Sequence, residues 1–228
     1  MSSRRTRPRP TGPRTCAWCS GPLAPDARAD TVTCSRRCRQ ARARFARAVG
    51  TGPACPGSPR RLAYADPPYP GLSGYYRDHP DYGGEVDHAA LIRRLCSYDG
   101  WALSTSARAL PDVLARCPPG VRVAAWHRGP RAARSHHPLP SWEPVLYVPG
   151  RPRDPDGPTV PDSLVHGVAP MTTLPSRVIG TKPGAFVRWL FDLLGACPGD
   201  DLDDLFPGSG AVGRAWHVYT TPENETRP

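Results

Sequence analysis

The sequence has almost no lysine and no long apolar run. Lys182 is the single lysine among 30 basic residues, so nearly all of the positive charge is carried by arginine. No stretch approaches the roughly 18 consecutive apolar residues of a membrane span, and the basic start of the chain lacks the apolar core of a secretory signal. We therefore expect a cytoplasmic protein with no membrane association. With 228 residues, 39% of them apolar, the chain is long enough for one medium domain and a small module.

Acidic residues are nearly absent from the first quarter of the chain. Residues 1–61 contain 14 arginines but only Asp26 and Asp30, a net charge of +12, whereas residues 62–228 carry −2. A basic segment beside a near-neutral domain is typical of a protein that binds a polyanion, most often nucleic acid. The alternative is a solvated arginine-rich tail. We interpret residues 1–13 as a basic disordered tail.

Four of the eight cysteines are closely spaced, as Cys16, Cys19, Cys34 and Cys38. Two short chelating pairs separated by fourteen residues fit one tetrahedral zinc ion, and metal binding would supply the folding energy of a segment with almost no core. Disulfides are the alternative, which the lack of a secretion signal disfavours. The other four cysteines show no paired spacing, and we expect them to be reduced thiols: Cys55, Cys96, Cys117 and Cys197.

The second cysteine pair also begins a helix, which we expect to start after Ser35 and to end at Gly50. One face of this helix is apolar and can cover the metal site, while six arginines on the other faces can contact phosphates. The segment resembles small four-cysteine zinc modules with a CS..CR helix start. We therefore divide the chain into a zinc module at 14–50, a Pro/Gly-rich linker at 51–60 and a larger domain at 61–228.

The larger domain begins with a short apolar run that ends in Asp66, Pro67, Pro68 and Tyr69. This pattern predicts a strand that stops at a rigid corner and presents a carboxylate. Taken alone, it could equally be a simple strand-terminating turn.

Two further motifs lie near the end of the chain. Residues 201–213 read as a strand followed by a glycine-rich turn that opens a helix, and the absence of a Cβ at Gly208 and Gly210 would let a ligand approach the backbone. Residues 181–195 predict a helix with Pro183 in its first turn and Gly195 at its end. A tight turn and a helix packed on a sheet are the alternatives for these two motifs.

Together the three motifs resemble the amino-group methyltransferases that use S-adenosylmethionine, in the permuted, beta-class-like order in which DPPY precedes the KP helix and the FxGxG motif. The resemblance implies N6-adenine methylation of DNA. We expect the DNA substrate to be double-stranded. It implies catalytic roles for Asp66, Pro67, Pro68 and Tyr69. It implies cofactor binding by Lys182, Pro183, Asp204, Phe206, Gly208, Ser209 and Gly210.

The proposed catalytic chemistry is simple. The amine of adenine is a poor nucleophile, and hydrogen bonds accepted by Asp66 and the Pro67 carbonyl would make its lone pair available. Tyr69 would stack on an extruded base. N4-cytosine methylation, RNA methylation or a non-catalytic zinc-containing nucleic-acid-binding protein remain alternatives, and the sequence does not indicate the oligomeric state.

The remaining periodicity predicts an α/β fold: a Rossmann-like, mostly parallel twisted sheet with helices on both faces, preceded by the small zinc module. We expect strands at 62–65, 100–105, 121–126, 144–148, 202–206 and 217–220, and crossover helices at 86–96 and 107–117. Residues 71–84 and 127–141 are interpreted as substrate-contacting loops, with plain surface loops as the alternative. The family usually continues to an acidic residue that binds the cofactor ribose, and Glu223 and Glu225 are the candidates for it, with a frayed chain end as the alternative.

Overall fold

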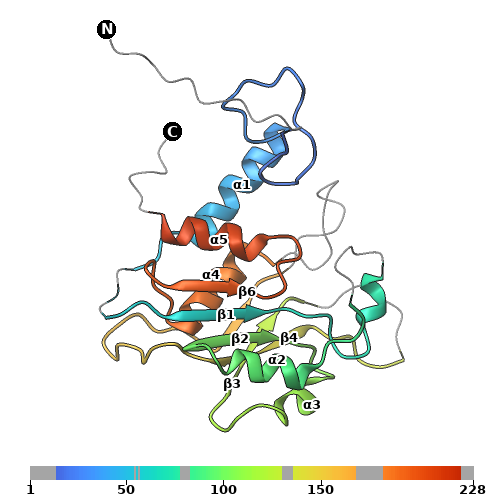
Figure 1. Cartoon of the computed structure of the whole chain (residues 1–228), viewed down its shortest axis with the longest axis vertical. Helices are drawn as coiled ribbons and strands as arrows, with labels where there is room; N and C mark the ends of the chain where they lie inside the picture. Colours follow the sequence, from blue (N-terminus) through green and yellow to red (C-terminus); the bar gives the residue numbers. More distant parts are fainter. Residues whose placement is uncertain are drawn as a thin grey trace.

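The computed structural model describes residues 14–53, 55, 57–77, 83–129, 136–167 and 182–221, and within them one sheet is covered by helices (Figure 1). The strands are β1 (Arg61–Ala65), β2 (Gly100–Ser104), β3 (Arg122–His127), β4 (Trp142–Val148), β5 (Ser163–Val165) and β6 (Asp201–Asp204). The helices are α1 (Arg36–Val49), the 3-10 helix η1 (Ser73–Tyr76), α2 (His88–Leu95), α3 (Leu110–Leu114), α4 (Gly184–Leu194) and α5 (Ala211–Thr220). No helix in these residues is long and apolar enough to cross a membrane.

The strands are arranged in the order β5-β3-β4-β2-β1-β6. β1 pairs in parallel with β2 and with β6, and β3 pairs in parallel with β5. β4 runs antiparallel to both β2 and β3. The predicted α/β fold is thus confirmed, with three parallel pairings and two antiparallel ones among the described strands.

Alternate residues of the central strands supply two cores, one on each face of the sheet. Leu62 and Tyr64 of β1 pack with α4 and α5, whereas Ala63 and Ala65 pack with α2 and α3. This division follows from the two-residue period of a strand. A strand buried on both faces is apolar throughout, which explains the run before Asp66.

The predicted crossover helices are found as α2 and the shorter α3, and α4 follows the KP motif as predicted. One strand prediction is wrong: residues 217–220 form the last turn of α5. The β-branched and aromatic side chains there suggested a strand. In the helix, however, Ala215 and Tyr219 lie four residues apart on one buried face, and packing of that face on α4 and α1 outweighs local propensity.

Helix α1 has the bounds that its cap residues predict, because the Ser35 hydroxyl accepts a hydrogen bond from the Cys38 amide (3.2 Å). It packs against α4 and α5 and carries the cysteine segment beyond them (Figure 1). At Gly184 a Cβ would lie only 2.9 Å from the Phe45 carbonyl oxygen, so this close approach requires glycine. Val49, at the end of α1, is buried in the same core as α4 and α5.

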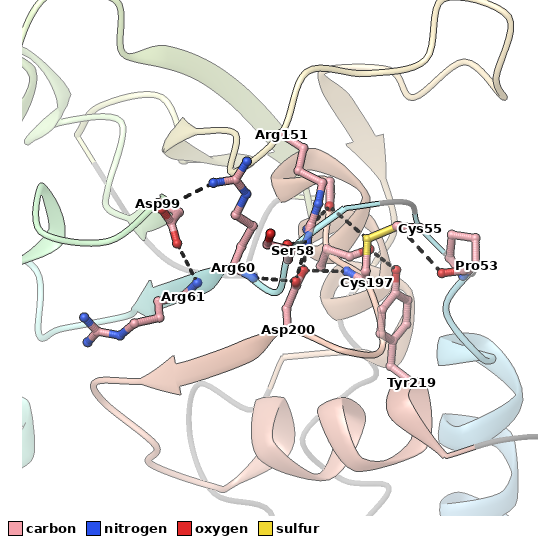
Figure 2. Close-up of polar contacts among 12 residues, drawn as sticks. Pro53, Cys55, Ser58, Arg60, Arg61, Asp99, Arg151, Cys197, Asp200 and Tyr219 are labelled. Carbon is pink, nitrogen blue, oxygen red and sulfur yellow. Dashed lines mark hydrogen bonds and ion pairs between the residues drawn. A yellow bond between two sulfur atoms is a disulfide. The ribbon is translucent and has the colours of Figure 1, made fainter.

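The connection between α1 and β1 has no helix or strand in its described residues and is tied to the domain by several contacts (Figure 2). The Gly52 amide donates to the Tyr219 carbonyl (2.8 Å), and the Arg60 amide donates to Asp200 (2.8 Å). Arg151 pairs with the same Asp200 carboxylate through both of its terminal nitrogens.

Two cysteines differ from the prediction. Cys55 of this connection and Cys197 form a disulfide with Cα atoms 5.8 Å apart, so the expectation of reduced thiols is wrong for this pair. The spacing gave no sign of it because the two cysteines are 142 positions apart in the sequence, and only the fold brings them within disulfide range. Cys96 and Cys117 are free, as expected.

Candidate active site and metal centre

Most of the predicted site residues lie at one edge of the sheet, where β1, β2, β3 and β6 end and β4 begins. Asp66 directly follows β1, and Asp204, the last residue of β6, is paired in register with Tyr64 of β1. The start of β4 reaches the same edge because β4 runs antiparallel to β2. Ligands of open α/β sheets commonly bind at this carboxyl edge.

Asp66 and Lys182 form a buried ion pair at this edge. Lys182 Nζ lies 3.1 Å from Asp66 Oδ1, and the lysine side chain is 7% exposed against 22% for the aspartate. The ammonium also faces the rings of Trp126 (5.3 Å) and Phe186 (5.4 Å). Burial raises the pKa of Asp66, although the Lys182 charge partly offsets this effect.

Glu143 holds three other side chains of the site together. Its Oε2 accepts a hydrogen bond from the Tyr69 hydroxyl (3.0 Å) and lies 3.4 Å from Lys182 Nζ. Its Oε1 lies 2.8 Å from Arg128 Nε, an ion pair whose N–H direction does not fit a hydrogen bond. Burial acts to raise the pKa of Glu143, but the charges of Lys182 and Arg128 outweigh it, and the pKa ends below its usual value.

No role was predicted for Glu143, which directly precedes the strand expected at 144–148. A carboxylate in an otherwise apolar run was the available signal, because a buried acid requires a partner. Arg128 had been placed in a substrate-contacting loop, and in the structure it pairs with Glu143.

The DPPY corner is partly enclosed. Pro67 is buried, and Pro68 and Tyr69 are half-buried. Burial and the nearby carboxylates, Asp66 first among them, raise the pKa of Tyr69 far above its usual value. The Tyr69 hydroxyl therefore stays protonated and acts as a donor to Glu143.

The glycine-rich turn lies beside this corner, held to β1 by a hydrogen bond from the Leu205 amide to the Tyr64 carbonyl (2.9 Å). Gly208 and Gly210 both have positive φ angles, +44° and +68°, which favour glycine. Among the described residues, a Cβ at Gly208 would approach only the Phe206 carbonyl oxygen, at 3.8 Å, whereas a Cβ at Gly210 would lie 3.1 Å from Arg214 Nη1. The open space next to the turn is therefore at Gly208.

Asp204 is the least compensated acid at this edge. Its Oδ1 is buried and has no hydrogen-bond partner among the described residues. Burial raises its pKa to about 6, a backbone hydrogen bond from Phe206 partly offsets this effect, and the charge of Asp66 adds to the increase. Thr105 directly follows β2. Its hydroxyl is also buried and has no hydrogen-bond partner within the residues that the structure describes.

These features suit a ligand that carries positive charge and hydrogen-bond donors. A cationic group between Asp204 and Asp66 would reduce their repulsion, and a donor would satisfy Asp204 Oδ1. The open backbone at Gly208 provides room for such a ligand. Lys182 and Pro183, in contrast, lie at the start of α4, where Lys182 contacts Asp66 and Glu143.

Several predicted residues lie outside the part that the structure describes. These are the proposed ribose-binding acids Glu223 and Glu225, the basic tail 1–13, and residues 78–82 and 130–135 of the two expected loops.

The four cysteines predicted to bind metal converge in space. All four sulfur atoms of Cys16, Cys19, Cys34 and Cys38 lie within 4.8 Å of one another. The Sγ–Sγ distances are 3.6 Å for Cys19–Cys34 and for Cys34–Cys38. Four sulfurs at about 2.3 Å from a shared zinc ion would be about 3.8 Å apart, so the arrangement fits a tetrahedral ion.

The outer faces of α1 carry a strong positive charge. Six arginines of this helix are exposed, and within the described residues none of them pairs with a carboxylate: Arg36, Arg37, Arg39, Arg42, Arg44 and Arg47.

No protein-family model and no curated protein matches the sequence. Among solved structures, M1.HpyAVI in complex with SAM overlays with a TM-score of 0.47 at 14% identity, covering 71% of this chain and 79% of that chain. At this sequence identity and TM-score, the similarity does not assign a function to the chain. We therefore infer the function from the residues of the site itself.

Proposed function

We propose that the protein is an S-adenosylmethionine-dependent methyltransferase that modifies the exocyclic N6 amine of adenine in double-stranded DNA. The observation that carries this proposal is the pair of acids at the ends of β1 and β6. Asp66 and Asp204 both have raised pKa values, and Asp204 has an unpartnered buried oxygen beside an open glycine-rich turn. The DPPY, KP and FxGxG resemblance supports the same assignment.

The cofactor is assigned to the turn after β6. Asp204 would accept a hydrogen bond from it, and the backbone from Phe206 to Gly210 would lie against it, with Ser209 between the two glycines. When bound, S-adenosylmethionine supplies the methyl group from a positively charged sulfonium. That positive charge would stabilise the Asp204 carboxylate, which burial and the charge of Asp66 otherwise disfavour.

Asp66 is assigned to the substrate amine. Lys182 occupies one of its oxygens, and the other would accept a hydrogen bond from an N–H group of adenine. This acceptor and the Pro67 carbonyl favour a pyramidal nitrogen whose lone pair can react. As the nitrogen gains positive charge, the Asp66 carboxylate stabilises it.

Tyr69 is assigned to the face of the adenine base. Its hydroxyl is fixed by Glu143 at 3.0 Å, and Glu143 is in turn held by Arg128 and Lys182. A ring held at both ends of its side chain is pre-organised for stacking, so less conformational entropy is lost when a flipped base arrives.

The N-terminal module is assigned to DNA binding. One structural zinc held by Cys16, Cys19, Cys34 and Cys38 would fix the segment before α1. The exposed arginines of α1 would contact backbone phosphates, which positions the duplex without reading its sequence.

Calorimetric titration with S-adenosylmethionine tests the proposal before any substrate is known. We expect saturable binding to the wild-type protein and loss of most affinity in Asp204→Ala. Arg122→Ala, at an exposed position of β3, is the control and should bind normally. If the wild-type protein does not bind S-adenosylmethionine, the methyltransferase proposal is wrong, and the alternative of a non-catalytic nucleic-acid-binding protein is favoured.

A further inference from the structure

Trp18 of the metal module faces Arg214 of α5, the helix that follows the glycine-rich turn. Trp18 precedes the metal ligand Cys19 and packs against the small cluster of Cys16, Leu23 and Cys38. Its ring also meets Phe45 of α1 edge-on, with centroids 5.4 Å apart. The position of Trp18 is therefore set by the cysteine site on one side and by α1 on the other.

Arg214, in the first turn of α5, links Trp18 to the turn. Its guanidinium carbon lies 5.7 Å from the centroid of the Trp18 ring. Its Nη1 donates a hydrogen bond to the carbonyl of Ser209 (2.8 Å), between the two glycines of the turn. The same nitrogen would lie 3.1 Å from a Cβ at Gly210, so the guanidinium packs directly on the turn.

The surroundings of Arg214 make it dependent on these contacts. The side chain is half-buried, and its Nε is buried without a hydrogen-bond partner among the described residues. Burial lowers the pKa of Arg214, which reflects incomplete compensation of its charge. The contacts with the Trp18 ring and the Ser209 carbonyl stabilise the positive charge of the guanidinium.

We propose that Trp18 and Arg214 form a bridge through which the metal module positions the glycine-rich turn, so that metal binding and cofactor binding strengthen each other. Within the described residues, the cluster around the cysteines has three buried members, Cys16, Leu23 and Cys38. Without metal, Trp18 loses its fixed place, Arg214 loses the ring that it faces, and Ser209 loses an ordered donor. By thermodynamic reciprocity, a ligand that orders the turn also favours the metal-bound module. This inference rests on the proposed function of the turn.

The first test measures S-adenosylmethionine affinity by calorimetry on the full zinc-loaded chain. We expect about 10-fold weaker binding in Trp18→Leu and in Arg214→Met, which lies within the range typical of coupled sites. Trp18→Phe keeps an aromatic face and should retain most of the affinity. Arg122→Met removes an exposed guanidinium from β3 and is the matched control. Arg214→Met lies outside the module, so it tests the bridge even if Trp18→Leu releases zinc.

The second test measures the reciprocal effect as the rate of zinc release to excess chelator. Saturating S-adenosylmethionine should slow release several-fold from the wild-type protein and should have no effect on Arg214→Met. If the wild-type protein binds S-adenosylmethionine but both variants bind it equally well and release is unaffected, the bridge is refuted and the proposed function stands. If the wild-type protein does not bind it, both proposals fall together.

Discussion

Lys182 Nζ lies 3.1 Å from Asp66 Oδ1, so the only lysine of the chain pairs with the aspartate that directly follows β1. The two residues are 116 positions apart and come together because α4 begins at the edge where β1 ends. Lys182 also lies 3.4 Å from Glu143, and Arg128 pairs with Glu143 from the other side. Two carboxylates and two cations thus balance one another around the proposed reaction centre.

Replacing Glu143 with glutamine should destabilise the fold and slow methyl transfer. Glutamine can still accept a hydrogen bond from the Tyr69 hydroxyl. It leaves Arg128 without a carboxylate partner, and Lys182 keeps only one of its two carboxylate partners, Asp66. Removing one member of a buried ion pair typically costs about 3 to 5 kcal/mol, and the remaining Asp66 contact should keep the loss near the lower end. Urea unfolding measures it. Asp162→Asn, at an exposed position directly before β5, is the control, and an equal loss there would count against the assigned role.

Asp204 should make the stability of the protein depend on pH. Its folded-state pKa of about 6 lies above the usual value of 3.8, so the folded state holds the proton more tightly. Stability from this group should therefore decrease as pH rises from about 4 to about 6 and then level off. Asp204→Asn should melt at a higher temperature than the wild-type protein at pH 8, and the two should converge near pH 4. A constant difference across this range would show that Asp204 does not titrate as described.

The cysteine site should hold one zinc ion per chain. Cys34→Ser removes a ligand whose sulfur lies 3.6 Å from two others, and we expect its metal content to fall well below one. Cys96→Ser changes a free thiol outside the cluster and should leave the content unchanged. Metal analysis of the purified proteins provides the measurement. Equal zinc in both variants would rule out this ligand set.

The arginine face of α1 should determine the salt dependence of DNA binding. Changing Arg37, Arg42 and Arg44 to serine should reduce the slope of log affinity against log salt by up to about 2.7, since each phosphate contact contributes about 0.9. These side chains are exposed, so the helix should remain folded. The same change at Arg93, Arg116 and Arg122, exposed arginines outside α1, is the control. An unchanged slope in the α1 variant would place the phosphate contacts elsewhere.

Sequence reasoning succeeded where the signal is local. The hydroxyl of Ser35 and the glycine at position 50 fix the ends of α1 within its own turns. The convergence of Asp66 with the glycine-rich turn also follows from general topology, because parallel strands end at a common edge. Both predictions needed only neighbouring residues and one rule of sheet architecture.

The features that sequence reasoning missed depend on contacts between distant segments. Glu143 gains its role only when β4 places it next to Tyr69 and Lys182, and Cys55 meets Cys197 across 142 residues. The packing of α1 on α4 depends on Gly184, which as an isolated glycine gives no sign of a helix contact. Residues 217–220 were predicted to form a strand from their local preference. They form the end of α5 because the helix buries Tyr219 in the core.

Methyl transfer by Asp66→Ala tests the central claim most directly. Tritiated-methyl transfer to duplexes with adenine or cytosine targets, followed by nucleoside analysis, measures both the activity and the modified atom. We predict N6-methyladenine from the wild-type protein and a loss of about 100-fold to 1,000-fold in Asp66→Ala, as expected for an acceptor aimed at developing charge, with S-adenosylmethionine binding retained. Label in N4-methylcytosine, or full activity in Asp66→Ala, would contradict the account.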